Sequence, residues 1–176
     1  MLKELSEKVI EKALKPHVVV GIAMGGLVPA VILARFLRVE VDAVGAKFYR
    51  GVDERGERPQ ITQDLSSDIE GLSVLLVDDV ADSGQTLKAV KEHIQKKGVS
   101  ELTTCTLHYK PWSIIKPDIY IDQTEAWIIY PWERKEAFRD IIEKMRSEGL
   151  SREETLNRMI ENGIPESLVE EMYKLP

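Results

Sequence analysis

The sequence predicts an α/β protein: a mostly parallel sheet flanked by helices, followed by a C-terminal helical extension. Over residues 1–133, short apolar runs alternate with segments in which apolar side chains recur at helical spacing. The apolar runs are nearly continuous, as in strands that helices cover on both faces of a parallel sheet. Residues 134–176 instead hold three segments of helical spacing. Together, these observations favour a sheet domain with helices added after it.

The elements are expected in alternating order along the chain. Apolar spacing predicts helices near residues 2–13, 27–37 and 87–94, and Gly98 is a suitable stop for the third. Apolar runs predict strands at residues 18–22, 39–46, 74–77, 102–107, 119–121 and 127–130. We therefore take residues 1–133 as one domain.

Two segments depart from this alternation. Residues 50–58 are charged and punctuated by glycine, which is typical of either a solvated hairpin or a mobile active-site lid spanning about residues 48–63. In the extension, Gly149 ends one helix, Ser151 and Glu154 form a capping box, and Pro165 opens a last helix. Residues 134–176 carry no basic excess, so we expect a packing or subunit-contact appendage.

Composition narrows the classes of function. With 24 Lys and Arg against 30 Asp and Glu, the net charge is −6, which disfavours nucleic acid as a partner. The single cysteine, Cys105, excludes an internal disulfide, and its apolar surroundings suggest a core position. We expect neither a membrane span nor a secretion signal, and hence a cytoplasmic protein.

The strongest functional signal is the segment VLLVDDVADSGQTL at residues 74–87. An apolar strand runs into Asp78 and Asp79, at the strand end where ligands bind in open parallel sheets. Their carboxylates suit vicinal hydroxyls or a divalent cation. The following Asp82-Ser83-Gly84-Gln85-Thr86 enters a helix, whose first amides and hydroxyls suit a phosphate. Helix capping alone would explain one polar residue here but not the whole segment.

Other nucleotide-binding motifs do not fit. The spacing of Gly21 and Gly26 matches a triphosphate-binding loop, but Leu27 and Val28 stand where Lys and Ser or Thr are needed. The dinucleotide pattern Gly-x-Gly-x-x-Gly is absent from the sequence.

Residues 74–86 resemble the signature of the type I phosphoribosyltransferases, which bind 5-phosphoribosyl 1-diphosphate (PRPP). The resemblance implies that Asp78 and Asp79 hold the ribose hydroxyls and, directly or indirectly, a metal, while residues 82–86 hold the 5-phosphate. Residues 20–30, VGIAMGGLVPA, are similar to the family's diphosphate loop, in which Gly25 and Gly26 present backbone amides.

One position departs from the family pattern. Relatives of the purine branch usually carry Arg or Lys where Met24 stands. Stabilisation of the diphosphate would then come from Mg²⁺, backbone amides or Lys47, with Tyr49 as a further contact. The loop of the family also often contains a non-proline cis peptide, for which Ala23-Met24 is the matching bond.

Further matches resemble the xanthine, hypoxanthine and guanine branch, and microbial xanthine-guanine enzymes in particular. Lys110 is placed like the lysine that donates to a purine 6-oxo group. Trp127 matches the residue that stacks on the base, and Ile128 and Glu133 match the segment that reads the 2-position through its backbone. Of the histidines, His93 is expected to face solvent and His108 to lie near the base, without catalytic roles.

The resemblance implies transfer of the phosphoribosyl group to hypoxanthine, guanine or xanthine with Mg²⁺, and a homo-oligomeric enzyme, either a dimer or a tetramer. Asp82 is the candidate for handling the purine proton. Lys110 and Trp127 argue against a pyrimidine or adenine relative. The alternative from a different class is a PRPP- or nucleotide-sensing regulator with little turnover, which Met24 favours.

Overall fold

The computed structural model describes residues 1–49 and 58–173. The chain divides into two compact units, Met1–Ala126 and Trp127–Pro176, and each is described by itself. The predicted lid is described only at its two ends, because residues 50–57 lie outside the described residues. The expected domain boundary at residue 133 stays a prediction.

The first unit is built on a six-stranded sheet with the strand order β3-β2-β1-β4-β5-β6. Every neighbouring pair is parallel except β2 and β3, which are antiparallel. This arrangement confirms the predicted α/β class with a mostly parallel sheet. The strands are β1 (Val18–Ala23), β2 (Glu40–Tyr49), β3 (Arg58–Gln63), β4 (Ser73–Ala81), β5 (Glu101–Tyr109) and β6 (Ile119–Gln123).

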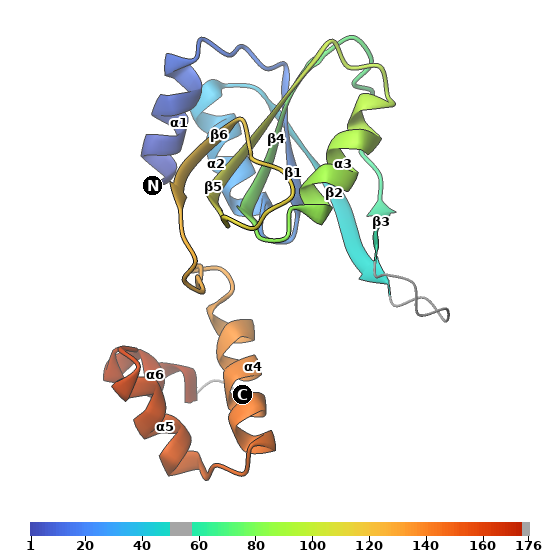
Figure 1. Ribbon diagram of the computed structural model, residues 1–176. Coiled ribbons are helices and arrows are strands. Elements are labelled where there is room, and N and C mark those ends of the chain that lie inside the picture. The colour runs from blue at the N-terminus through green and yellow to red at the C-terminus, as the bar shows by residue number, and fades with distance from the viewer. Residues whose placement is uncertain (50–57, 174–176) are drawn as a thin grey trace. The chain divides into compact units, whose positions relative to one another are not determined.

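Helices cover both faces of this sheet. In Figure 1, α1 (Leu2–Glu11) and α2 (Leu27–Leu37) lie on one face and α3 (Gln85–Gln95) lies on the other. The alternation of side chains along β1 and β4 supplies both cores, so that Val20 and Leu76 pack with Leu87 and Val90 under α3. The central strands are therefore buried on both sides, which is why they read as continuous apolar runs.

Cys105 lies in this core, as expected. The side chain is fully buried in β5. Burial raises the pKa of the thiol to about 12, with the nearby Asp118 carboxylate acting in the same direction. The thiol therefore stays protonated and behaves as a small apolar group.

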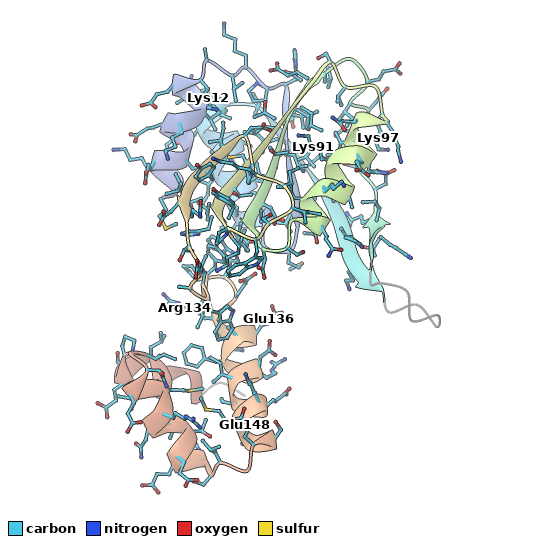
Figure 2. The ribbon with its side chains drawn as sticks, in the orientation of Figure 1. Lys12, Lys91, Lys97, Arg134, Glu136 and Glu148 are labelled. Atoms are coloured by element: carbon cyan, nitrogen blue, oxygen red, sulfur yellow. The ribbon has the colours of Figure 1, made fainter. Side chains whose placement is uncertain are left out.

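The second unit contains α4 (Arg134–Ser147), α5 (Arg152–Glu161) and α6 (Glu166–Tyr173). The predicted capping box is present: the Ser151 side chain accepts from the Glu154 amide, and the Glu154 carboxylate accepts from the Ser151 amide. A small core joins the helices through Phe138, Met159 and Val169. Figure 2 labels Arg134 and Glu136 of α4 and Glu148, the residue after it; all three are exposed.

One expectation about local structure is wrong, and two further details were not expected. Residues 127–130 form no strand but an irregular segment at the start of the second unit. Strand β3 was not expected, because an edge strand rich in polar residues lacks an apolar run. His93 does not simply face solvent, since its Nε2 lies 2.8 Å from Oδ1 of Asp64. In the part of the chain that the structure describes, no helix meets both the length and the apolarity of a membrane span.

Candidate active site

Asp78 and Asp79 lie near the carboxyl end of β4, in the middle of the sheet. Contrary to the strand end expected at these residues, β4 continues to Ala81, which pairs with Tyr109 of β5. Both carboxylates are buried. Asp78 Oδ1 accepts from the Asp79 amide at 3.0 Å, and Asp79 Oδ1 accepts from the Val80 amide at 2.7 Å. These bonds fix the direction of both side chains.

The turn after β4 is formed by Asp82, Ser83 and Gly84. Gly84 has a φ of +76°, which glycine adopts without strain, and α3 begins at the next residue. Ser83 Oγ accepts from the Gln85 amide at 3.3 Å. A cavity of about 300 Å³ opens at this turn, lined among others by Ala23, Asp78, Asp82, Ser83, Gly84 and Thr86. The predicted phosphate loop and one of the two carboxylates thus share a cavity.

The glycine loop after β1 packs directly onto the acidic pair. A Cβ at Gly25 would overlap the Asp79 carboxylate, and a Cβ at Gly26 would lie 2.9 Å from the Asp78 Cα. The Ala23-Met24 peptide is cis, and the Met24 side chain is 79% exposed. The structure therefore brings the predicted diphosphate loop against Asp78 and Asp79, with both glycines required by close approach.

Lys47 lies further along β2, exposed and two residues beyond Gly45, the register partner of Ala23. The Tyr49 side chain lies outside the described side chains, although its backbone belongs to β2.

Lys110 follows the last residue of β5 and is buried. Its amide donates to Ala81 O at 3.0 Å, and its ammonium donates to the carbonyl of Ala126. The neighbouring His108 lies opposite Val80 in the sheet. Burial lowers the pKa of His108, and the charge of Lys110 acts in the same direction, against the carboxylates of Asp122 and Asp79. Lys110 and the acidic pair therefore lie at the carboxyl ends of adjacent strands.

Three predicted base-binding residues belong to the second unit. These are Trp127, Ile128 and Glu133, and they are described within that unit only. Trp127 is 66% exposed and lines a groove of about 800 Å³ within that unit, which α4 lines through Ile141 and Met145. Their contribution to a base site stays a prediction.

Trp112 is a site residue that the sequence analysis missed. Its Nε1 donates to Asp82 Oδ1 at 2.9 Å, and the Lys110 ammonium lies 5.8 Å from its ring centroid. A lone tryptophan two residues after Lys110 carries no periodic or motif signal. The contact between Trp112 and Asp82 becomes visible only in the structure, where a turn brings residues 112–114 back to the loop after β4.

The acidic pair suits Mg²⁺ held partly by substrate. Across residues 1–49 and 58–173, no group of three or more His, Cys, Asp or Glu side chains could hold a metal by itself. Mg²⁺ commonly uses one or two carboxylates and takes its remaining ligands from water and substrate phosphates. Asp78 and Asp79 match that limited donor set.

Sequence comparison identifies the class that this site defines. The family described as "Phosphoribosyl transferase domain" matches residues 1–137, and the chain belongs to it. The xanthine-guanine phosphoribosyltransferase of Chromohalobacter salexigens is 34% identical over 133 residues, which are 73% of this chain and 76% of that protein. Within the family the chain lies in the purine branch, as a purine phosphoribosyltransferase and pentosyltransferase.

Two solved structures are also similar. The purine phosphoribosyltransferase from Pyrococcus horikoshii Ot3 superposes with a TM-score of 0.69 at 43% identity, covering 74% of this chain and 86% of that one. A hypothetical protein from Neisseria gonorrhoeae, solved with bound ppGpp, superposes with a TM-score of 0.66 at 28% identity, covering 75% and 82%. The expected fold family is therefore confirmed.

Proposed function

We propose that this protein transfers the 5-phosphoribosyl group of PRPP to a 6-oxopurine, giving the purine 5′-mononucleotide and diphosphate in purine salvage. One observation carries the proposal: the glycine loop after β1 and the acidic pair of β4 are in contact. Gly25 and Gly26 leave no room for a Cβ beside Asp79 and Asp78. A diphosphate at the loop amides would therefore lie next to carboxylates suited to ribose hydroxyls.

The PRPP site follows from these positions. Asp78 and Asp79 accept hydrogen bonds from the ribose hydroxyls. The hydroxyls of Ser83 and Thr86, with the amides of residues 82–86, receive the 5-phosphate at the start of α3, where the helix dipole favours an anion. Asp78, Ser83 and Thr86 line one cavity, which supports this assignment. Gln85 contributes its backbone amide.

The leaving diphosphate faces the loop of Ala23, Met24, Gly25 and Gly26. Met24 cannot supply a cation, so backbone amides, Lys47 and Tyr49 contact the diphosphate. When bound beside Asp78 and Asp79, Mg²⁺ supplies positive charge that neutralises it.

The base site uses the buried ammonium of Lys110 as donor to the 6-oxo group. A donor at this point favours a 6-oxo acceptor over a 6-amino group. Trp127 stacks on the purine, and the backbone near Ile128 and Glu133 reads the 2-position. A bond forms from the purine nitrogen to ribose C1 while the bond from C1 to the diphosphate breaks. Asp82 accepts the proton that leaves N7.

A coupled purine screen tests the proposal. The protein is mixed with PRPP, Mg²⁺ and one of hypoxanthine, guanine, xanthine, adenine, orotate or uracil, and mononucleotide is measured. Product with one or more 6-oxopurines and none with the other bases is expected. Product with adenine or a pyrimidine instead would contradict the role of Lys110, and the rates rank the three 6-oxopurines.

A sensing regulator is the second candidate, and the exposed Met24 favours it, because this position lacks a cation for the leaving group. The Neisseria gonorrhoeae protein with bound ppGpp has a similar fold. Binding of PRPP or a nucleotide by calorimetry, with no product from any base in the screen, would support this candidate over the enzyme.

We also propose a homo-oligomer, either a dimer or a tetramer. The sequence of α2, LVPAVILARFL, is apolar almost all round, and a helix of this kind is normally covered on every side. In a single chain, however, Val31 and Phe36 on α2 are exposed. A second copy packing on α2 would bury them. A cytoplasmic location stays a prediction.

A further inference from the structure

The turn of residues 110–115 packs tightly against the loop that carries Asp82. The Lys110 amide donates to Ala81 O, and the Ile114 amide donates to Ser83 O, both at 3.0 Å. A Cβ at Gly84 would overlap Ser113 Oγ. The turn and the loop therefore form one connected piece of structure, although they are about 30 residues apart in sequence.

Trp112 is the exposed side chain of this turn, and it reaches both charged groups of the proposed base site. Its Nε1 donates to Asp82 Oδ1, and its ring lies near the Lys110 ammonium. The ring is 55% exposed, so burial of apolar surface does not account for a tryptophan here. The indole has a single polar atom, which is a donor only, and this suits it to hold a carboxylate.

We infer that Trp112 is a positioning residue for Asp82, an inference that rests on the function proposed above. Because the indole N–H holds Oδ1, the carboxylate keeps a fixed orientation at the cavity that Asp82 lines. A proton acceptor held in this way meets the purine without first losing side-chain rotational freedom. Trp112 itself exchanges no proton with the substrate.

Trp112→Phe removes the N–H and keeps an aromatic ring. We expect kcat with the preferred purine to fall about three- to tenfold, the range for one charge-assisted hydrogen bond at a partly exposed site, while KM for PRPP changes less than about twofold. In an Asp82→Ala background the same substitution should leave kcat unchanged, because Trp112 acts through Asp82. Thermal unfolding of each variant checks that the fold is intact.

The indole N–H signal in a ¹H–¹⁵N spectrum gives a readout that needs no activity. The signal lost in Trp112→Phe belongs to Trp112, and we expect it to shift in Asp82→Ala while those of Trp127 and Trp132 stay in place. An unshifted signal, wild-type kcat in Trp112→Phe, or an equal loss in the Asp82→Ala background would each overturn the inference. A wild-type protein that makes no nucleotide contradicts the proposed function instead, and the inference that Trp112 holds Asp82 is then decided by the signal alone.

Discussion

Asp82 lines the same cavity as Asp78 but differs from it in position, since it lies in the turn after β4 and not in the strand. Its proposed role in handling the N7 proton predicts that Asp82→Asn lowers kcat by about a hundredfold, within the usual range for a general base. The Kd for PRPP with Mg²⁺ should rise less than about threefold, because the amides that hold the phosphate remain. Steady-state kinetics and calorimetry measure the two effects. Equal losses in both would remove the proton role.

Gly25 makes close contact between the glycine loop and the acidic pair of β4 possible. In Gly25→Ala the added Cβ would overlap the Asp79 carboxylate, so the loop or the carboxylate must move. We expect the Kd for PRPP to rise at least about tenfold, since misplaced binding groups lose charge-assisted hydrogen bonds.

A control for Gly25→Ala is Gly149→Ala in the second unit, where a Cβ meets open space but φ is +85°. It should cost about 1 kcal/mol of stability through its strained backbone and leave the PRPP affinity unchanged. Unchanged affinity in Gly25→Ala would show that the loop does not need this close approach.

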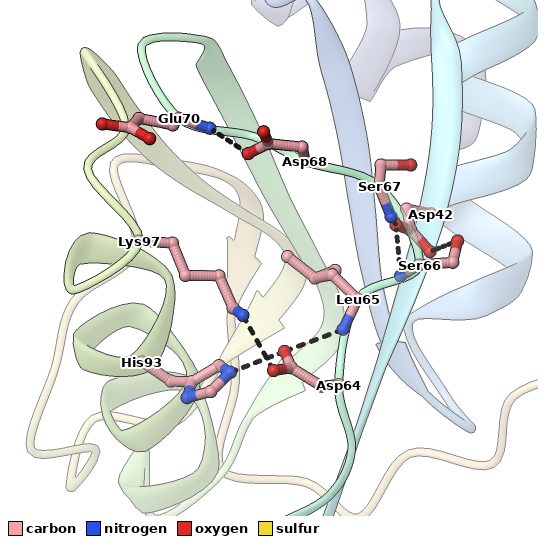
Figure 3. Close-up of polar contacts among 9 residues, drawn as sticks. All are labelled: Asp42, Asp64, Leu65, Ser66, Ser67, Asp68, Glu70, His93 and Lys97. Carbon is pink, nitrogen blue, oxygen red and sulfur yellow. Dashed lines mark hydrogen bonds and ion pairs between the residues drawn. The ribbon is translucent and has the colours of Figure 1, made fainter.

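At the scale of elements, residues 64–67, which follow β3, form hydrogen bonds with two other parts of the fold (Figure 3). Asp42 of β2 accepts from the amides of Ser66 and Ser67 at 2.9 and 2.8 Å. Asp64 accepts from His93 of α3 and from Lys97 in the turn after α3, both at 2.8 Å. The predicted lid thus starts from the strand pair β2 and β3. The segment that follows β3 is in turn bound to β2 through Asp42 and to α3 through His93.

Asp64 gives this attachment a pH dependence. The hydrogen bonds from His93, and next from Lys97, hold the pKa of the Asp64 carboxyl well below its usual range. A lowered native pKa stabilises the fold above the unfolded pKa of about 4 and ceases to do so as the pH falls through the native value. Asp64→Asn should therefore lower stability near neutral pH, by less than about 1 kcal/mol because the pair is half-exposed.

Chemical denaturation of wild type and Asp64→Asn at several pH values tests this. The difference between the two proteins should shrink steadily as the pH falls below about 4. A difference in stability that does not change with pH would mean that the charge of the Asp64 carboxylate does not stabilise the position of this segment. Glu70→Gln is a suitable control, because Glu70 is exposed and follows the same segment.

Sequence patterns predicted the elements that bury apolar side chains and missed those that do not. β1, β4 and β5 are buried on both faces and were readable as apolar runs, whereas β3 is polar. Residues 127–130 were misassigned because an apolar run also occurs in an irregular segment, whose Trp127 and Ile129 line a groove together with residues of α4 and α5. Trp112 and Asp64 make contacts between distant segments, which no local pattern encodes.

At the scale of the whole molecule, oligomerisation follows from the exposed apolar surface of α2. Phe36 is 55% exposed on an otherwise apolar helix, so Phe36→Glu would place a charge in a contact between copies. Burying an unpaired charge costs several kcal/mol, enough to dissociate an ordinary dimer at micromolar concentration. Light scattering after size-exclusion chromatography should give a larger assembly for the wild type and a monomer for this variant.

Ile160→Glu separates this interface from one formed by the helical extension. Ile160 is a partly exposed apolar side chain on α5, so the substitution makes the same kind of change in the second unit. If α2 forms the contact, Ile160→Glu keeps the wild-type mass. Dissociation by Ile160→Glu alone would instead assign subunit contact to residues 134–176, the role that their helical pattern first suggested. A wild-type monomer would contradict both, and Val31 and Phe36 would then need another partner to cover them.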